Sequence, residues 1–334
     1  MSSAQPTDPI FVTGGTGLLG SNLARRLVAQ GHRVRLLVRA RRHPALEQLP
    51  IDWVPGDLSD LPALTAGMRG CCWVYHVAGA VSYRPADAAL LYATNVLGTR
   101  NVLAAAARAG VARVVHTSST AAVGLSARPD QVLDETAPFG REFEGDPYMR
   151  TKHLAEQEVE RAVAGGLDAV IVNPSTMYGG GDVNRNTSAV FPGLRRGTMF
   201  AAPPGGTAVV SVDDAVTGHL LAMERGQRGR RYILSSENLT YLDVLNRIAR
   251  VIGGPPVRRT IPAALEGLLA TIAAVASAVA PSVPVTRHVI RFSFRYRYFS
   301  AARARAELGW EPRVPLEEAV RAAWQFFVDS SSTS

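Results

Sequence analysis

The sequence contains a single lysine, Lys152, among 36 basic residues in a chain of 334. The other basic residues are arginines spread along the chain, and the formal net charge is +8. Such a charge is suited to an acidic partner. The chain has no run of five basic residues and no basic motif interleaved with aromatics, so we predict no nucleic-acid partner. We interpret the replacement of lysine by arginine as a compositional bias.

Cysteine is also scarce. Cys71 and Cys72 are adjacent in an apolar run, and no second pair stands at metal-ligand spacing. We therefore predict reduced, buried cysteines and no metal site. Residues 1–9 lack the charged and then apolar pattern of a signal peptide. These absences predict a protein of the reducing cytoplasm.

No apolar run is long enough to span a membrane. Residues 261–280 are rich in Ala, Leu and Val, but Glu266 interrupts them and Pro281 ends them. About 14 uncharged positions remain, against the roughly 20 that a spanning helix needs. We predict a buried helix or a lid helix here, with contact to a membrane surface as the alternative.

The pattern that is present alternates short apolar runs with longer amphipathic ones, as in repeated βαβ units. Six strands are predicted at residues 10–13, 34–38, 53–54, 73–77, 113–117 and 169–173. Helices are predicted at 18–30, 61–68, 88–109 and 148–164, with glycines at 31, 110, 165 and 166 ending three of them. The fold class is therefore α/β, a Rossmann-type doubly wound parallel sheet with a smaller C-terminal substrate-binding lobe.

After residue 174 the sequence becomes rich in Gly and Pro, with shorter elements. We predict a dinucleotide-binding domain at 8–174, with elements continuing at about 208–235. Residues 175–330 form mainly the substrate-binding lobe, interleaved with it. The expected assembly is a monomer or a homodimer.

A glycine-rich segment at residues 13–20, TGGTGLLG, follows the first strand and opens an amphipathic helix. A dinucleotide site needs a backbone free to turn, a backbone close to the pyrophosphate, and helix N–H groups directed at the anion. Because the strand and the helix flank the glycines in the required order, the segment is predicted to bind a dinucleotide.

The end of the second strand distinguishes NAD from NADP. NAD sites place an acidic residue there for the ribose 2′-hydroxyl, whereas NADP sites place an arginine for the 2′-phosphate. No Asp or Glu stands between Asp8 and Glu47, while Arg39, Arg41 and Arg42 follow the strand. The sequence therefore favours NADP, with NAD as the alternative.

Two further segments are placed to meet the cofactor. Asp57, after the third strand, is predicted to reach the adenine edge. The small residues at 77–79, after the fourth strand, let the backbone approach the cofactor. We interpret His76 beside them as a packed histidine rather than a catalyst.

Tyr148 and Lys152 open the helix after the fifth strand, and their i, i+4 spacing puts both side chains on one helical face. A free phenol titrates near about 10, and a nearby ammonium lowers that pKa. The ammonium can also donate to the nicotinamide ribose, a task for which a planar guanidinium is poorly shaped. With nine Tyr in 334 positions, one randomly placed lysine would stand four residues after a Tyr about 3% of the time. The pair is the predicted proton-transfer machinery.

Hydroxyl side chains end the fifth strand at residues 117–120, at the edge of the sheet where open α/β folds bind ligands. We expect one of them to hydrogen-bond the substrate oxygen. Ser119 is the first candidate and Ser118 the second.

Thr-Gly-x-x-Gly-x-x-Gly, the serine and Tyr-x-x-x-Lys, in this order, resemble the short-chain dehydrogenase/reductase superfamily. The chain length and the lobe after Pro174 resemble its extended members, the NAD-dependent epimerase/dehydratase family. The similarity continues through residues 95–99, 173–179, 212–214 and 307–310, and so covers nearly the whole chain. Residues 37–39 and 174–182 look like the dihydroflavonol-4-reductase-like branch, which includes bacterial proteins labelled hopanoid-associated sugar epimerases.

The resemblance implies a catalytic triad of Ser119, Tyr148 and Lys152. It further implies that Asn95 lies near the cofactor and that Pro174 and Ser175 line the nicotinamide. The predicted cofactor-binding residues are Gly14, Thr16, Gly17, Leu18, Leu19, Gly20, Arg39, Arg42, Asp57, Leu58, Val77, Ala78, Gly79, Asn95, Thr117, Ser118, Tyr148, Lys152, Pro174, Ser175 and Met177. The predicted substrate residues are Ser119, Thr120, Tyr148 and Tyr178.

One departure from the family is informative. Sugar dehydratases of this superfamily carry an acidic pair just after the serine, where this chain has Thr120 and Ala121. Dehydration is therefore not expected.

The leading prediction is a reductase of a ketone or aldehyde, which is an alcohol dehydrogenase in reverse. NADPH delivers the hydride, Tyr148 gives the proton, Lys152 lowers the tyrosine pKa, and Ser119 polarises the oxygen. The apolar residues 263–280 are expected to wall a pocket for a hydrophobic substrate.

Two other functions remain open. One is a nucleotide-sugar epimerase, which would retain its cofactor. It would bind the diphosphate of its substrate through Arg185, Asn186, Arg195 and Arg196. The third possibility is a non-enzymatic NADP-sensing protein on the same fold.

Overall fold

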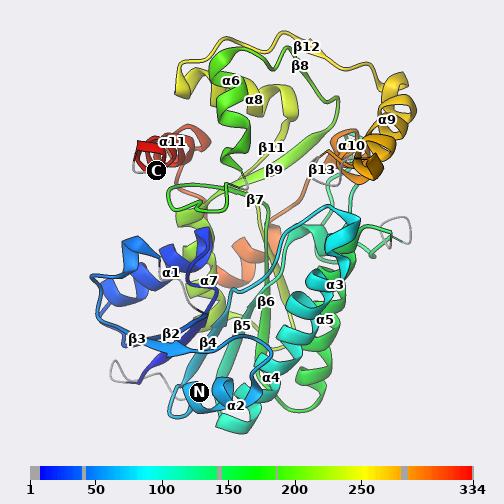
Figure 1. Cartoon of the computed structure of the whole chain (residues 1–334). Helices are drawn as coiled ribbons and strands as arrows, with labels where there is room; N and C mark the ends of the chain where they lie inside the picture. Colours follow the sequence, from blue (N-terminus) through cyan, green and yellow to red (C-terminus); the bar gives the residue numbers. More distant parts are fainter. Residues whose placement is uncertain (1–7, 40–42, 141–144, 186, 280–284, 333–334) are drawn as a thin grey trace.

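The structure is a computed structural model that describes residues 8–39, 43–140, 145–185, 187–279 and 285–332. The chain forms a larger lobe, in which a parallel sheet lies between two layers of helices, and a smaller lobe of short strands and helices (Figure 1). The larger lobe has the Rossmann-type arrangement, which confirms the predicted fold class.

The main sheet has seven parallel strands in the order β3-β2-β1-β4-β5-β6-β10. Their bounds are β1 Ile10–Thr13, β2 Val34–Val38, β3 Ile51–Pro55, β4 Trp73–His76, β5 Arg113–Thr117, β6 Ala169–Pro174 and β10 Arg231–Leu234. Six of them are the predicted strands, and β10 adds a seventh beside β6. The strand order reverses between β1 and β4, the switch point where such sheets bind ligands at the carboxyl ends of their strands.

Helices bury both faces of this sheet. On one face lie α1 (Leu18–Ala29) and α7 (Val212–Arg225). On the other lie α2 (Leu61–Met68), α4 (Gly98–Ala109) and α5 (Pro147–Ala164). Strands covered on both sides need apolar residues at successive positions, which is why they read as continuous apolar runs.

The helix predicted at 88–109 is interrupted. α3 (Ala88–Leu91) passes into a π-helical turn at Tyr92–Leu97 before α4 begins. Within this turn the Asn95 carbonyl accepts a hydrogen bond from the Thr99 hydroxyl at 2.6 Å. Such turns occur frequently at functional sites. The prediction of a helix at 88–109 is therefore confirmed in its bounds, and the π-helical turn within it was not predicted.

The glycines predicted to end helices behave as expected at three positions. Gly31, Gly110 and Gly166 have φ values of +85°, +70° and +107°, which L side chains rarely adopt. Gly165 has an ordinary φ of −77°. After α5 the left-handed turn is therefore made by Gly166 alone.

The smaller lobe is built around β9 (Gly206–Ser211), which pairs with three short strands. The other strands are β7 Thr176–Tyr178, β8 Ala201–Ala202, β11 Glu237–Thr240, β12 Arg259–Thr260 and β13 Tyr296–Arg297. The helices are α6 Phe191–Arg196, α8 Tyr241–Ile252, α9 Glu266–Val279, α10 Arg287–Ser293 and α11 Leu316–Ser332. An apolar core between α6, α8, α11 and β9 holds this lobe together.

The two lobes are interleaved, because the chain leaves the main sheet after β6 and returns through α7 and β10 (Figure 1). The C-terminal segment is fastened to α7 at Asp214. The Trp310 indole donates to the Asp214 carbonyl at 2.9 Å, and the Asp214 carboxylate accepts from the backbone N–H groups of Arg313 and Val314. The motifs at 212–214 and 307–310 thus join distant parts of the chain.

The apolar segment at 261–280 forms α9, which packs against α10. Within α9 only Ala270 and Ala273 are buried, while Leu268, Ile272 and Val275 are exposed. Of the two predicted alternatives, the buried helix was wrong, because the large apolar residues of α9 lie on its outer side, whereas the lid helix stays a prediction. None of the helices in the described part of the chain combines the length and hydropathy that crossing a bilayer requires.

Candidate active site

The glycine loop between β1 and α1 assigns a different task to each glycine. Gly14 has φ +76°, and a Cβ on it would lie 2.5 Å from the Ala78 nitrogen. A Cβ on Gly20 would lie 2.2 Å from the Gly14 carbonyl oxygen. A Cβ on Gly17 would meet only that same oxygen, at 3.6 Å. Gly14 and Gly20 therefore allow the chain to pack, whereas Gly17 borders open space.

The N-terminus of α1 is suited to an anion. Its N-cap is Gly17, which provides no side-chain hydrogen bond, and its first turn has no acidic residue. By contrast, side chains of Asp60, Asp146, Ser211 and Thr240 cap α2, α5, α7 and α8. The uncapped N–H groups and the positive end of the helix dipole beside open space fit the pyrophosphate of a dinucleotide.

The other predicted residues of the loop contribute backbone. Thr16 and Leu18 are partly exposed at the start of α1. The Leu19 side chain is buried in the core beneath the helix, so only its main chain can face a ligand. The sequence motif therefore predicts a main-chain site.

Arg39 and Asp57 lie close together beyond β2 and β3, and both are exposed. Hydrogen bonds from the Ser59 hydroxyl and N–H hold the pKa of Asp57 below its usual value, and the Arg39 charge lowers it further. The backbone carbonyl of Leu58, which lies between Asp57 and Ser59 in the sequence, accepts a hydrogen bond from the Asn101 side chain. Arg41 and Arg42 lie outside the described residues. Of the three arginines that follow the second strand, Arg39 is thus the one that the structure describes.

The end of β4 approaches α5 through small residues. The Ala78 N–H donates to the Thr13 hydroxyl at 3.1 Å. A Cβ on Gly79 would lie 3.4 Å from Asn95 Oδ1 and 3.7 Å from Lys152 Nζ. Residues 77–79 therefore bring the β4 end close to the lysine, where a larger side chain would fill the space.

Asn95 joins this segment to α5. Its side chain exchanges hydrogen bonds with the backbone of Ala80, at 2.8 and 3.1 Å, and donates to the Thr151 hydroxyl at 3.1 Å. Since protein groups occupy both polar atoms of the Asn95 side chain, the structure gives it a positioning role beside Lys152.

His76, at the end of β4, is fully buried. Its ring nitrogens hydrogen-bond the Thr13 and Thr99 hydroxyls at 2.8 and 3.0 Å. Burial and then the Lys152 charge lower the pKa of His76 to about 3, so the ring is neutral. This is the environment of a packed histidine.

Tyr148 and Lys152 lie in the first two turns of α5. Asp146 caps this helix, with its Oδ1 accepting from the Met149 N–H at 2.7 Å. The cap fixes where α5 begins and therefore where both side chains point. Both are nearly buried, with 8% and 6% of their surfaces exposed.

Lys152 is held at the end of β5. Its Nζ donates to the Thr117 carbonyl at 2.8 Å. Burial lowers the pKa of Lys152 to about 8, and the Glu156 carboxylate opposes that shift. The ammonium is therefore the main form at neutral pH and is lost just above it.

Burial also governs the state of Tyr148. Burial raises the pKa of Tyr148 well above its usual value, while a hydrogen bond with Ser119 and the charge of Arg297 lower it. Lys152 is not among the main groups that shift the pKa of Tyr148 in the described part of the chain, and its Nζ donates to the Thr117 carbonyl. The phenol is therefore protonated, and the two hydroxyls of Ser119 and Tyr148 lie together as predicted.

Ser118 faces away from that pair. Its hydroxyl donates to Glu156 Oε1 at 2.5 Å in the protein interior. Thr117 hydrogen-bonds His219 through its hydroxyl at 3.0 Å, and Thr120 is buried in a short helical turn. Of the hydroxyl residues at 117–120, Ser119 is the one beside Tyr148.

Residues after β6 complete this edge of the sheet. Pro174 is the last residue of β6, and Met177 and Tyr178 lie in β7. The buried Ser175 hydroxyl has no hydrogen-bond partner among the described residues. A polar atom left in this state calls for a ligand group, and the amide of a nicotinamide has both donors and acceptors for it.

Sequence reasoning missed Glu156, which anchors the network beneath Lys152. Its carboxylate accepts from Ser118, from Asn173 at 2.6 Å and from Arg231 at 3.1 Å. The signal was available, since Glu156 follows Lys152 by the same four residues that separate Lys152 from Tyr148.

Sequence reasoning also missed Arg297 on β13. Its Nη2 donates to the Tyr241 hydroxyl at 3.0 Å, and its buried Nε has no partner among the described residues. The charge of Arg297 lowers the pKa values of Tyr83 and Tyr148, and the guanidinium also interacts electrostatically with Tyr178. Only long-range folding of the smaller lobe brings Arg297 close to Tyr148, so no local motif could have identified this residue.

Tyr83 links Tyr148 to α10. Its ring packs edge-to-face on Tyr148 with centroids 5.6 Å apart, and on Phe292 of α10 with centroids 5.7 Å apart. The Thr286 hydroxyl donates to the Tyr83 carbonyl at 3.2 Å. The aromatic wall of the site therefore comes from α10, whereas the sequence pointed to residues 263–280.

The arginines considered for a diphosphate have other partners. Arg185 stacks on the Phe327 ring at 4.9 Å, and Arg195 donates to the Gly253 carbonyl at the end of α8. Arg196 is exposed in the last turn of α6, and Asn186 lies outside the described residues.

The sequence pattern of the NAD dependent epimerase/dehydratase family matches residues 10–235, which span the glycine loop, the tyrosine–lysine pair and β10. The chain belongs to this family. Members use a nicotinamide cofactor, and the chain is accordingly an NAD(P)-dependent oxidoreductase of the extended short-chain dehydrogenase/reductase type.

Two curated relatives and one solved structure illustrate the similarity. The chain is 40% identical to a putative dihydroflavonol 4-reductase of Synechocystis over 96% of this chain and 94% of the relative. It is 37% identical to sterol demethylase protein B of Methylococcus capsulatus over 75% and 77%. The crystal structure of gox2253 superposes with a TM-score of 0.85, 35% identity and coverage of 97% and 99%.

Proposed function

We propose that this member of the family is an NADPH-dependent reductase of a ketone or aldehyde, which oxidises the corresponding alcohol in reverse. The observation that carries the proposal is the buried, protonated Tyr148 beside the Ser119 hydroxyl, with the Lys152 ammonium on the same helix. A protonated phenol is the form of tyrosine that can give a proton to a carbonyl oxygen as it becomes an alcohol.

Each side chain has one role in this reaction. The bound reduced nicotinamide supplies hydride to the carbonyl carbon. Tyr148 donates its phenolic proton to the carbonyl oxygen, and Ser119 donates a hydrogen bond to the same oxygen as negative charge develops there. Lys152, charged at neutral pH, stabilises the tyrosinate that remains and is placed to bind the nicotinamide ribose.

The preference for NADP rests on the end of β2. Arg39 is exposed there, and no carboxylate stands where an NAD site places one. A guanidinium matches the geometry and charge of the ribose 2′-phosphate. Asp57, near Arg39, remains the candidate contact to the adenine.

The substrate side of the site combines aromatic walls with one charge. Tyr83 offers an apolar ring beside Tyr148, and Phe292 extends this wall. Arg297 presents a buried Nε without a partner among the described residues, which suits an oxygen of the substrate. The names of the relatives, a dihydroflavonol reductase and a sterol demethylase, fit an apolar ring system that carries oxygen groups.

The reductase is favoured over a nucleotide-sugar epimerase because Arg185 and Arg195 are engaged with Phe327 and Gly253. An epimerase would also keep its cofactor through purification, which is easily observed by absorbance. We also propose a cytoplasmic location, which the two free cysteines, Cys71 and Cys72, fit.

The test is consumption of NADPH with a panel of ketones, aldehydes and nucleotide sugars. Tyr148→Phe should lower kcat by about 100-fold or more, because it removes the proton donor. Tyr92→Phe, which removes the hydroxyl of an exposed tyrosine, serves as the control and should retain most of the activity. Full turnover by Tyr148→Phe would exclude the mechanism, and conversion of nucleotide sugars without net NADPH consumption would establish the epimerase instead.

A further inference from the structure

The exposed face of α9 carries an unbroken apolar stripe. Leucine, isoleucine and valine recur every three or four residues from the turn before the helix to its last residue, which places them in one line along the helix. Their exposed fractions are 40% for Leu265, 59% for Leu268, 54% for Ile272, 60% for Val275 and 81% for Val279. Contiguous apolar surface of this kind marks an interaction site.

No charge interrupts the stripe. Glu266 is the one charged residue of α9, and Arg295 neutralises its carboxylate through an ion pair of 2.9 Å. The inner side of the helix, at Ala270 and Ala273, packs against the protein. The outer side is therefore entirely apolar or small along its length.

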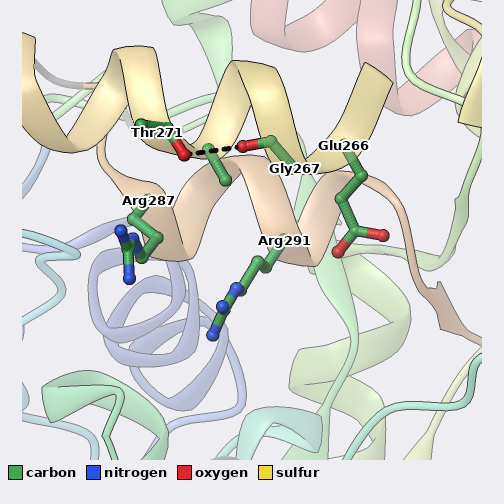
Figure 2. Close-up of a pocket in the computed structure, with 6 residues that line it drawn as sticks. Glu266, Gly267, Thr271, Arg287 and Arg291 are labelled. Atoms are coloured by element: carbon green, nitrogen blue, oxygen red, sulfur yellow. Dashed lines mark hydrogen bonds between the residues drawn. The ribbon is translucent and has the colours of Figure 1, made fainter. Parts of the chain in front are cut away.

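Two arginines stand beside the stripe. A hollow of about 360 Å³ lies between α9 and α10, and Arg287 and Arg291 of α10 line it together with Gly267 and Thr271 (Figure 2). Gly267 and Thr271 are exposed while Ala270, which also lines the hollow, is buried, so the hollow opens to solvent along the seam between α9 and α10. Neither Arg287 nor Arg291 forms an ion pair within the described part of the chain.

The positive charge at this place is therefore uncompensated. Glu266 also lines the hollow, but Arg295 already holds its carboxylate. Burial is the largest cause that lowers the pKa of the neighbouring His288, and the charges of Arg291 and Arg287 lower it further. The α9 surface, defined as the stripe from Leu265 to Val279 with Arg287 and Arg291, is thus apolar along one line and cationic at its flank.

We propose that the α9 surface docks on a bilayer that contains anionic lipids. The apolar stripe enters the boundary between headgroups and acyl chains, and the guanidiniums of Arg287 and Arg291 bind lipid phosphates. A helix with apolar residues on one side and arginines at its border is built for this position, because the long arginine side chains reach the headgroups while the stripe is immersed.

The charge argues against a second copy of the chain as the occupant. A two-fold symmetric contact through the stripe would bring Arg287 and Arg291 of both copies to the same interface without acidic partners. Anionic headgroups, by contrast, neutralise both guanidiniums. The docking does not depend on the proposed reductase chemistry.

The α9 surface is connected to the active site through α10. α9 packs on α10, and Phe292 of α10 packs on Tyr83, which contacts Tyr148. A docked enzyme would thus hold its substrate side at the lipid, where an apolar substrate is dissolved.

The experiment is sedimentation of the full-length protein with vesicles of phosphatidylcholine and phosphatidylglycerol, against vesicles of phosphatidylcholine alone. We expect binding to the anionic vesicles that weakens with added salt. Ile272→Asp should weaken it by about tenfold or more, because it places a charge in the stripe. Arg287→Gln with Arg291→Gln should weaken it by about fivefold per arginine on anionic vesicles only.

Leu90→Asp places the same charge on an exposed apolar residue of α3 and is the matched control, which should bind like the unaltered protein. All variants change exposed residues, and their thermal unfolding verifies that they fold. Absence of sedimentation with anionic vesicles, or unchanged binding by Ile272→Asp, overturns the proposal. A dimer in light scattering that Ile272→Asp dissociates, without vesicle binding, would make the stripe an interface between copies and overturn it equally.

Discussion

Lys152 and Glu156 occupy successive turns of one face of α5, and the Glu156 carboxylate raises the pKa of an ammonium that burial lowers. Glu156 is itself tied to Ser118, Asn173 and Arg231. Burial and the buried Glu156 carboxylate therefore shift the protonation of the single lysine in opposite directions.

This relationship predicts how activity depends on pH. The Lys152 ammonium is present below its pKa of about 8 and is lost above it, so kcat should fall on the alkaline side of pH 8. Glu156→Gln removes the charge that raises this pKa, so the fall should move to lower pH by about one unit. A pH profile of kcat measures it. Glu158→Gln changes a carboxylate paired with Arg100 and should leave the profile in place, and an unmoved profile in Glu156→Gln would contradict the coupling.

Lys152→Arg tests the argument from the lone lysine. The charge is kept, but a planar guanidinium replaces a compact ammonium that donates to Thr117 in a buried site. We expect kcat to fall by about 100-fold or more while the fold is retained. Near-normal turnover would make the position of the one lysine a coincidence.

Two glycine substitutions separate cofactor binding from folding. Gly17→Ala adds a methyl group where only the Gly14 oxygen is near, so the protein should fold normally and bind the dinucleotide about tenfold or more weakly. Gly20→Ala places a methyl group 2.2 Å from that oxygen and should lower the unfolding temperature. Calorimetric titration with NADP and thermal unfolding measure the two effects. Undiminished cofactor affinity in Gly17→Ala would place the pyrophosphate elsewhere.

Arg39→Ala addresses the choice of cofactor. Loss of a charge-assisted contact to the 2′-phosphate should raise KM for NADPH by about tenfold, with little effect on KM for NADH. Arg108→Ala, which changes an arginine in the last turn of α4, is the control. Equal losses with both cofactors would remove Arg39 from the phosphate site.

Arg297→Met tests the substrate side. The variant removes the guanidinium beside Tyr241 and Tyr148, and we expect KM for the carbonyl substrate to rise by about tenfold or more. Affinity for NADP should not change. Arg295→Met, which loses an ion pair with Glu266 instead, should keep its KM. If both variants raise KM to the same extent, the increase comes from a loss of stability in the smaller lobe and not from a lost contact with the substrate.

Local patterns were sufficient for the cofactor half of the molecule. The glycine loop, the strands and the Tyr148–Lys152 pair are encoded by residues a few positions apart, so periodicity and spacing reveal them. Ser119 could be placed at the edge of the sheet because it follows the end of β5 by two residues. Which of the hydroxyls at 117–120 faces the site depends on side-chain direction, which the strand pattern does not give.

Other features depend on contacts between distant parts of the chain. Arg297 reaches Tyr148 only because β13 pairs with β9 across the smaller lobe. The exposure of α9 depends on which of its faces meets α10, and composition alone favoured burial. The π-helical turn at Tyr92–Leu97 contains Asn95, whose side chain hydrogen-bonds the backbone of Ala80, a contact that helix propensity does not predict.

We expect a dinucleotide bound at the uncapped start of α1 to stabilise the folded state. N–H groups that a side chain would satisfy in another helix are left at Gly17 for a pyrophosphate. A ligand that binds only the native chain stabilises it by about 2.7 kcal/mol at a concentration 100 times its Kd. The supply of dinucleotide should thus control how long the protein survives heating or proteolysis, and a depleted pool would lower its amount as well as its turnover.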